Sequence, residues 1–341
     1  PPLDYPPAEG ARSRRAQCVS YTLRDGGRTP IHRAVGTFTR GVQRLIGDLD
    51  SRTTAQGAPG GGAPPAPASG PAKVYDSARR QDPFWEELIE AWRYRALVAQ
   101  LVDRDVKLRY KRSILGVAWT MINPLLTMLV LTFVFSHLFR FDVPNYPVYM
   151  LSANLLWVFF SQSTTAAMNQ LMTGGVLLTR IYVPRTLFGL AAVGTGLVNL
   201  VLSLLPMAAI MLITGAPITP AVVWLIPVMV LAALFALGIG LLLSSLAVIF
   251  PDVKEMYEAL LPAWFFLTPV MYPASILPEG YREWLALNPM VYLVESFRAP
   301  LYAGSPPAPE MLFSAAVAAA VTVVIGWAVF TARADQMAYR L

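Results

Sequence analysis

The sequence predicts an all-α membrane protein with six transmembrane helices. The run from Thr186 to Pro251 contains no Asp, Glu, Lys or Arg, whereas the helices of a soluble domain need a polar face toward water. Its length suits two membrane crossings, because each needs about 20 apolar residues to cross a hydrocarbon core of roughly 30 Å. The chain is 55% hydrophobic and only 14% charged, while soluble domains carry ~25% charged residues.

Similar charge-free windows supply the remaining crossings. Gly215, Pro217 and Pro220 interrupt the long run with a turn, so that it divides into two spans. In chain order, the expected spans are 113–139, 147–170, 187–213, 221–250, a fifth that begins near Tyr257, and 313–332.

Composition disfavours several classes of function. The net charge is +6, but Arg residues that flank membrane spans account for a positive excess without nucleic-acid binding. The single cysteine, Cys18, excludes an internal disulfide, and the two histidines, His32 and His137, exclude a multi-histidine zinc site, so no metal is expected. None of the four lysines follows a GxxxxG motif, so any ATPase that drives this chain is a separate polypeptide.

Residues 1–75 differ from everything that follows them. They are rich in Pro, Gly, Ala and Arg, and the stretch 57–70 consists almost wholly of Gly, Ala and Pro. Such a segment cannot bury enough apolar surface to fold. A disordered cytoplasmic extension is therefore expected here.

An amphipathic helix is predicted after this extension. Asp82-Pro83 places an N-cap residue before a proline at the first helical position. Trp85, Leu88 and Trp92 then share one face, opposite acidic and basic residues. The helix is too polar to span and is expected to lie in the membrane interface; a soluble helix packed on another domain is the alternative.

A basic cluster at 104–112 sets the orientation. Because Lys and Arg gather on the cytoplasmic side of membrane proteins, the N-terminal side is expected in the cytoplasm, and six crossings return the C-terminus there. The interface helix and basic segment then occupy 76–112, and the six-span domain occupies 113–341 of a plasma (inner) membrane protein.

The stretch 268–309, between the fifth and sixth spans, has eight prolines and several aromatic residues. Its apolar patches are too short to cross a bilayer. We expect broken, partly re-entrant helices at the outer face, since non-helical backbone is tolerated at that depth where protein surrounds it.

Ionisable side chains are scarce in the predicted spans, which argues against an ion-coupled carrier. The carboxylates lie near span ends, where they are expected as helix-end and interface charges: Asp103, Asp105, Asp252, Glu255, Glu258 and Glu295. A membrane-embedded glycosyl- or phosphotransferase would need paired carboxylates with a metal, and it is the alternative from another class.

Aromatic and uncharged polar side chains are abundant instead. Rings stack on sugar faces and amides bind hydroxyls, so such a lining suits a long neutral glycan; membrane-interface belts and helix packing are the alternative. The candidate lining residues are Trp119, Phe133, Trp157, Phe159, Phe160, Tyr257, Trp264, Phe265 and Phe266.

Two cytoplasmic turns stand out, Arg180–Arg185 and Pro251–Glu255. The first is short and basic, and the second opens a helix with a proline and acids that the helix dipole favours. They are expected either to dock a cytoplasmic motor or simply to flank the spans.

The run Arg104-Asp-Val-Lys-Leu-Arg-Tyr-Lys-Arg112, followed by Leu115-Gly-Val-Ala-Trp119 and Pro124-Leu125, resembles the opening of a permease subunit of type-2 ABC exporters. The similar branch is the polysaccharide, O-antigen and teichoic-acid group. Further matches are Tyr182-Val-Pro-Arg185, Leu267-Thr-Pro-Val-Met-Tyr272, Leu287-Asn-Pro289 and the closing Arg333–Leu341. Pro251 departs from the Arg that this family usually carries, and residues 1–75 lie outside its pattern.

The resemblance implies a homodimer above two ATPase subunits, with ATP and magnesium bound by the ATPase and no cofactor in this chain. A channel between protomers would pass a lipid-linked polysaccharide; export of a small molecule or drug is the alternative. The implied ATPase-coupling residues are Arg180, Tyr182, Pro184, Arg185, Asp252, Lys254 and Glu255. The implied outer-gate residues are Tyr272, Tyr281, Trp284, Asn288 and Tyr292.

Overall fold

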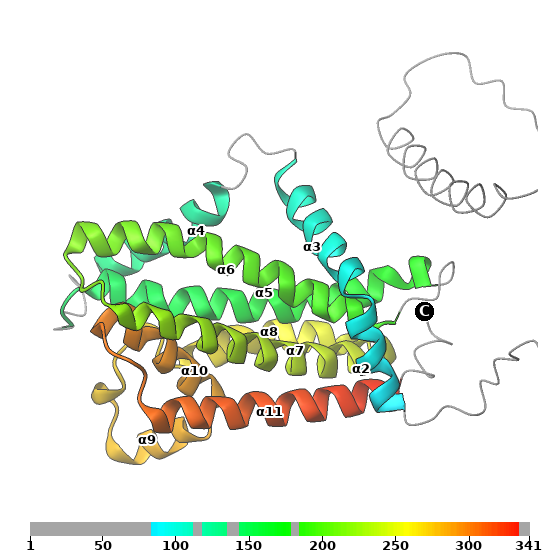
Figure 1. Cartoon of the computed structure of the whole chain (residues 1–341). Coiled ribbons are helices and arrows are strands. Elements are labelled where there is room, and N and C mark those ends of the chain that lie inside the picture. Colours follow the sequence, from blue (N-terminus) through cyan, green and yellow to red (C-terminus); the bar gives the residue numbers. More distant parts are fainter. Residues whose placement is uncertain (1–82, 112–117, 135–142, 179–183, 334–341) are drawn as a thin grey trace, which may run out of the picture. The chain divides into compact units, whose positions relative to one another are not determined.

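The computed structural model describes residues 83–111, 118–134, 143–178 and 184–333, and the regular structure in these ranges is helical (Figure 1). The predicted extension 1–75, the coupling residues Arg180 and Tyr182, and the end of the chain after Arg333 lie outside the described residues.

The helices, in chain order, are α2 (Pro83–Arg93), α3 (Arg95–Tyr110), α4 (Ala118–Phe133), α5 (Tyr146–Leu178), α6 (Thr186–Thr214), α7 (Leu225–Ile249), α8 (Asp252–Leu267), α9 (Glu279–Ala286), α10 (Pro289–Arg298) and α11 (Pro309–Ala332). Short turns of tighter or wider helix are η2 (Pro220–Trp224), η3 (Ala274–Ile276) and η4 (Ala299–Ala303).

Within the described residues, three helical segments are long and apolar enough to cross a membrane: Thr186–Thr214, Pro220–Ile249 and Pro309–Ala332. They correspond to the predicted third, fourth and sixth spans. The last begins a turn earlier than predicted, because Pro309 suits the first helical position and Glu310 suits the positive N-terminal end of the helix dipole.

Helix α5 lies at the centre of the fold and packs against α4, α6, α7, α8 and α10. Its polar residues lower its hydropathy, yet Ser152 and Thr164 are fully buried. Each hydroxyl donates to a carbonyl of the preceding turn, Tyr149 O at 2.9 Å and Phe160 O at 2.9 Å. The helix runs to Leu178, beyond the predicted end at residue 170, because no charged residue interrupts it there.

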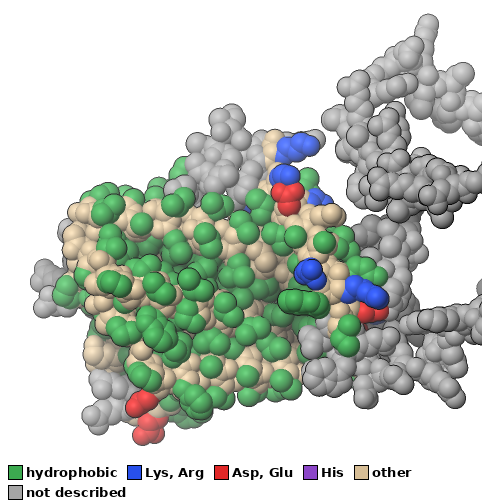
Figure 2. Space-filling model, viewed as in Figure 1, with side chains coloured by type: hydrophobic (Ala, Val, Ile, Leu, Met, Phe, Trp, Pro, Cys, Tyr) green, Lys and Arg blue, Asp and Glu red, His purple; other side chains and the backbone are tan. Residues whose placement is uncertain are grey.

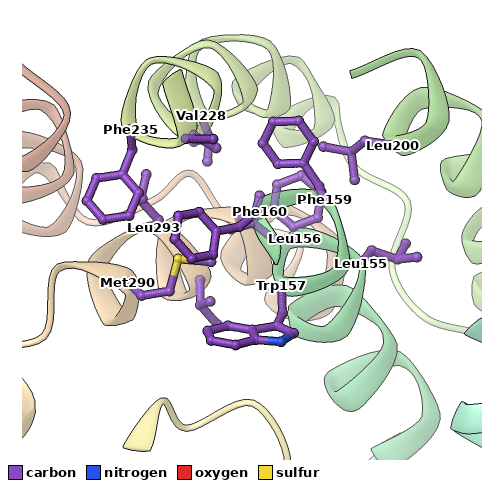
Figure 3. Packing of buried hydrophobic residues seen from close by; sticks show 14 of the residues in the cluster. Leu155, Leu156, Trp157, Phe159, Phe160, Leu200, Val228, Phe235, Met290 and Leu293 are labelled. Carbon is purple, nitrogen blue, oxygen red and sulfur yellow. The ribbon is translucent and has the colours of Figure 1, made fainter. Parts of the chain in front are cut away.

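The buried core around α5 is built from large apolar side chains. Leu156 and Phe160 project from α5 toward Val228 and Phe235 of α7, and Leu293 comes in from α10 (Figure 3). The Phe160 and Phe235 ring centroids are 5.4 Å apart.

Helix α8 corresponds to the predicted fifth span, and it starts in the turn 251–255 that the sequence predicted to open a helix, ahead of the span start expected near Tyr257. The helix begins at Asp252, directly after Pro251, with Asp252 and Glu255 in its first turn. Its 16 residues extend only about 24 Å at ~1.5 Å per residue. A 3₁₀ turn, α9 and α10 follow it, as expected for a Pro-rich segment too broken to span.

The predicted interface helix begins at Pro83 as expected, but it does not continue unbroken through the basic segment. Tyr94 is a turn residue between α2 and α3. Trp92 and Ile89 are 73% and 67% exposed, which suits a face in contact with lipid headgroups. The side chains of Trp85 and Leu88 lie outside the described residues.

Glycines allow the closest helix contacts. The backbones of α7 and α11 touch where Gly238 faces Thr322 and Gly326. A methyl group at Gly194 of α6 would lie 2.9 Å from Val102 Cγ2 of α3. These contacts join α11 and α3 to the central helices.

Candidate functional site: an aromatic cluster and a groove

Aromatic rings from α5 and α8 form one cluster. The ring centroids of Trp157 and Trp264 are 6.1 Å apart, and those of Phe160 and Trp264 are 5.1 Å apart. Phe265 lies 5.4 Å from Trp157 and 5.5 Å from Phe266. Residues that are about a hundred positions apart in sequence are thus brought together as edge-to-face pairs, an arrangement that aromatic rings favour.

Four of the predicted lining residues are buried inside the protein. Trp157, Phe159, Phe160 and Tyr257 keep only 7%, 3%, 1% and 6% of their surface exposed. In this conformation they pack the core, so they do not line a surface that a passing molecule could reach. Sequence alone could not separate the three rings of α5 from surface ones, because polar and apolar residues alternate along α5 without a dominant face.

The other predicted lining residues are accessible where their side chains are described. Phe133 of α4 and Phe266 of α8 are exposed, while Trp264 and Phe265 are half-buried. The side chain of Trp119 lies outside the described residues. Helix α8 therefore presents the accessible part of the aromatic cluster.

A groove of about 460 Å³ adjoins this part of α8. Its wall is mostly apolar and aromatic, with one amide, and is formed by Trp264, Leu267, Tyr272, Leu277, Trp284, Leu285, Leu287, Asn288 and Pro289. Three predicted outer-gate residues are therefore brought together. The fourth, Tyr292, lines a neighbouring groove of about 430 Å³, and the side chain of Tyr281 lies outside the described residues.

Asn288 joins α8 to α10 at the back of the groove. Its Oδ1 accepts hydrogen bonds from Trp264 Nε1 at 2.9 Å and from the backbone N–H of Met290 at 3.1 Å. Its Nδ2 donates to Thr268 Oγ1 at 3.0 Å. Asn288 is thus the N-cap of α10, with Pro289 at the first helical position, and it also fixes the Trp264 ring.

The tyrosine hydroxyls near the groove are bound to backbone carbonyls. Tyr272 donates to Phe266 O at 2.8 Å, and Tyr292 donates to Ala286 O at 2.7 Å. With these hydroxyls satisfied, the groove offers mainly ring faces. Aromatic faces suit apolar or sugar-ring surfaces.

The predicted coupling residues lie at the start of α6 and of α8. Pro184 is buried and Arg185 is half-buried. Asp252 and Glu255 are exposed, and Lys254 Nζ lies 4.0 Å from Glu258 Oε1. This turn of α8 therefore displays a mixed-charge surface.

Basic side chains gather on α2 and α3 (Figure 2). Arg93, Arg104 and Lys107 are exposed there, and Lys107 pairs with Asp103 at 2.6 Å. Asp105 accepts a hydrogen bond of 2.8 Å from Gln170 Nε2 of α5, so α3 is anchored to the central helix.

Tyr257 attaches the start of α8 to α5. Its hydroxyl lies 2.7 Å from Thr164 Oγ1. Either hydroxyl can be the donor, and Thr164 Oγ1 also lies 2.9 Å from the Phe160 carbonyl oxygen. Met168 and Ala247 surround the pair. Sequence analysis treated Tyr257 as a lining residue, but the structure makes it a joint between helices.

Arg298 is the residue that sequence analysis missed. Among the described residues it is the only charged side chain that is buried, with 3% of its surface exposed. It pairs with Glu295, three residues earlier on α10. The available signal was an acidic and a basic residue at helical spacing inside an otherwise apolar segment.

The sequence matches the ABC-2 type transporter family over residues 96–302. It is 39% identical over 258 residues to the O-antigen export system permease protein RfbA of Myxococcus xanthus, which covers 73% of this chain and 96% of that protein. It is 25% identical to the polysialic acid transport protein KpsM of Escherichia coli, over 70% of this chain and 94% of that protein. The capsule polysaccharide export inner-membrane protein CtrC of Neisseria meningitidis serogroup B is 24% identical, over 63% and 82%. This chain therefore belongs to the ABC-2 type transporter family.

Proposed function

We propose that this chain is the transmembrane subunit of an ATP-driven exporter that moves a lipid-linked cell-surface polysaccharide across the plasma membrane. The observation that carries the proposal is the 39% identity to an O-antigen export permease along 96% of that protein's length. The capsule and polysialic acid relatives extend the same class of cargo.

In this proposal α4, α5, α6, α7, α8 and α11 are the six spans, and α9 and α10 are outer short helices. The exposed Lys and Arg residues of α2 and α3 support a cytoplasmic position for that end of the helices, by the positive-inside rule. Two copies of the chain would enclose the cargo path, with the exposed face of α8 turned toward it. Phe266 and Leu260, both at least 60% exposed, support that orientation.

The partner ATPase would bind at the turns before α6 and α8. Arg185 and the exposed Asp252 and Glu255 supply charges of both signs there, which suits a polar, reversible interface. ATP and its magnesium ion would belong to that partner. The residues of this chain would only transmit movement.

The groove beside α8 is where we place contact with the glycan. Trp264, Tyr272 and Trp284 offer ring faces, and Trp284 is 72% exposed. Sugar rings stack on such faces without a fixed set of strong hydrogen bonds, which suits a long chain that must keep moving. Weak, repeated contacts allow passage, as in other pores.

The test uses a host strain from which the gene has been deleted. Loss of surface polysaccharide with accumulation of the lipid-linked glycan inside the cell is expected, and the intact chain should restore export. Unchanged surface polysaccharide would contradict the proposed cargo. Trp284→Ala should lower the restored export severalfold, while Trp224→Ala, an exposed tryptophan on η2 outside the groove, should not.

A further inference from the structure

The backbone segment Pro269–Tyr272 connects α8 to the short helices, and its four carbonyls accept hydrogen bonds from side chains. Arg298 Nη2 donates to Pro269 O at 2.8 Å and to Val270 O at 3.3 Å. Tyr146 donates to Met271 O at 2.8 Å, and Tyr149 donates to Tyr272 O at 3.2 Å. Four consecutive carbonyls are thus satisfied without a helix or a sheet.

This arrangement answers a physical requirement. Val270 is fully buried and Met271 nearly so, and buried backbone carbonyls need donors. Outside regular structure, side chains must supply them, and the Arg298 guanidinium is suited to two neighbouring acceptors because its N–H groups form a planar fork.

A carboxylate and an aromatic ring contact the Arg298 guanidinium. Glu295 accepts from Nη1, and the Tyr149 ring lies under the guanidinium, 3.8 Å from its carbon to the ring centroid. Since an unpaired buried cation costs several kcal/mol, these two partners explain how Arg298 remains charged among apolar helices. Tyr302 completes the packing, with its ring 5.2 Å from that of Tyr149 and its hydroxyl donating to Pro144 O at 2.8 Å.

The clamped segment is continuous with the groove. Tyr272 is both the last clamped residue and part of the groove wall. Thr268, the residue before the segment, accepts from Asn288, which holds Trp264. The positions of two groove rings therefore depend on where this short backbone segment lies.

We propose that Arg298, together with Tyr146 and Tyr149, is a positioning clamp that fixes the 269–272 backbone and thereby holds the groove in the shape that the passing cargo contacts. The inference rests on the proposed function for the role of the groove. The clamp itself is independent of which cargo moves.

Labelling of a buried reporter measures the clamp directly. In the full chain with Cys18→Ser, Val270→Cys places a thiol at a fully buried position inside the segment, and Met207→Cys places one at a fully buried position in α6. A maleimide reacts with each thiol only when the surrounding structure opens. Tyr149→Phe removes one hydrogen bond and should raise labelling at 270 about fivefold, the factor for one net hydrogen bond; Arg298→Lys should raise it further.

Control measurements distinguish a local effect on the 269–272 segment from a loss of stability of the whole fold. The same variants should leave labelling at 207 unchanged, and Tyr257→Phe, which loses a buried hydroxyl elsewhere, should leave labelling at 270 unchanged. Unaltered labelling at 270 in both Arg298→Lys and Tyr149→Phe would overturn the clamp. An equal rise at 207 and 270 would also overturn it, because Arg298 would then serve the whole fold.

A second experiment tests whether the clamp affects export through its effect on the groove. Arg298→Lys should lower restoration of surface polysaccharide in the deletion strain severalfold, with normal amounts of chain in the membrane. Faster labelling at 270 with unimpaired export would refute the positioning role. If the intact chain itself restores no polysaccharide, the proposed cargo is wrong. The labelling result still decides whether the clamp exists.

Discussion

The contact of α7 with α11 makes a quantitative prediction for Gly326→Ala. An added methyl group would lie 2.8 Å from the carbonyl carbon of Gly238 and 3.0 Å from its Cα, and still closer to its oxygen. Ordinary contact begins at 3.4 Å, so relieving the contact with the carbonyl carbon alone requires the two helices to separate by 0.6 Å, and the closer oxygen requires more. A gap of that size forfeits roughly a quarter to a half of the dispersion energy across it.

The expected cost follows from two opposing effects on stability. Overpacking costs about 1–3 kcal/mol, whereas replacing a helical glycine with alanine gains at most about 1 kcal/mol from helix propensity. The packing cost outweighs the propensity gain, because helix pairs in membranes associate mainly through close van der Waals contact. We expect the free energy of unfolding to fall by about 1–2 kcal/mol.

Reversible denaturation of the purified chain in detergent measures this change. Gly280→Ala is the matched control: Gly280 lies in α9 with nothing within 4 Å of an added methyl group, so this variant should be equally or more stable. Gly238→Ala should resemble Gly326→Ala, and the double variant should cost less than the two losses together, because one separation of the helices accommodates both methyl groups. A Gly326→Ala chain at least as stable as the original would refute the close approach of α7 and α11.

Further predictions concern the two ends of α8 and the start of α6. Asn288→Ala should lower stability by about 1 kcal/mol through loss of the N-cap and free the Trp264 ring, which a rise in iodide quenching of tryptophan fluorescence would reveal; unchanged quenching would contradict the bond. Tyr257→Phe should leave the ATPase partner bound but lower export per ATP hydrolysed in proteoliposomes, and Thr164→Val should do the same, with normal coupling in both variants arguing against the joint. Arg185→Glu should weaken co-purification of the ATPase while the unfolding midpoint of this chain stays constant; normal assembly would remove Arg185 from the docking surface. Trp264→Ala should lower export, and unaltered export would return that ring to a packing role.

Charge-free windows carried most of the information about the spans. The observed helices α6, α7 and α11 follow the expected ranges closely, because a helix that faces lipid cannot tolerate charge on any side. Pro251 and Asp252 marked the start of α8 in the sequence as well, although hydropathy alone placed the span several residues later. Local capping chemistry was therefore the better guide at that boundary.

The sequence did not predict which side chains of α5 are buried and which are exposed. Its apolar and small polar residues alternate without a dominant face, so Phe160 of α5 was as good a candidate for a lining as Phe266 of α8. In the structure Phe160 is buried and Phe266 is 61% exposed. Contacts between segments that are distant in sequence decide which ring is buried, and the residues next to each ring give no sign of these contacts.

Arg298 was missed for a related reason. Charges near the ends of spans were assigned to helix termini, where most of them belong. The need for a donor in that region comes from the non-helical carbonyls of 269–272, and nothing in the sequence marks which backbone groups lack helical partners. Only the path of the chain reveals that requirement.

The attachment of α8 links these observations. Among its residues Tyr257 alone is buried, and it binds Thr164 of α5, while Trp264 near the other end binds Asn288 of α10. The helix is therefore fastened near each end by one hydrogen-bonded aromatic residue. Under the proposed function, a push from the ATPase on Asp252 would reach α5 through Tyr257 and the groove through Trp264. A rigid helix held in this way can transmit movement along its axis without unfolding, which is what the proposed function requires of this subunit.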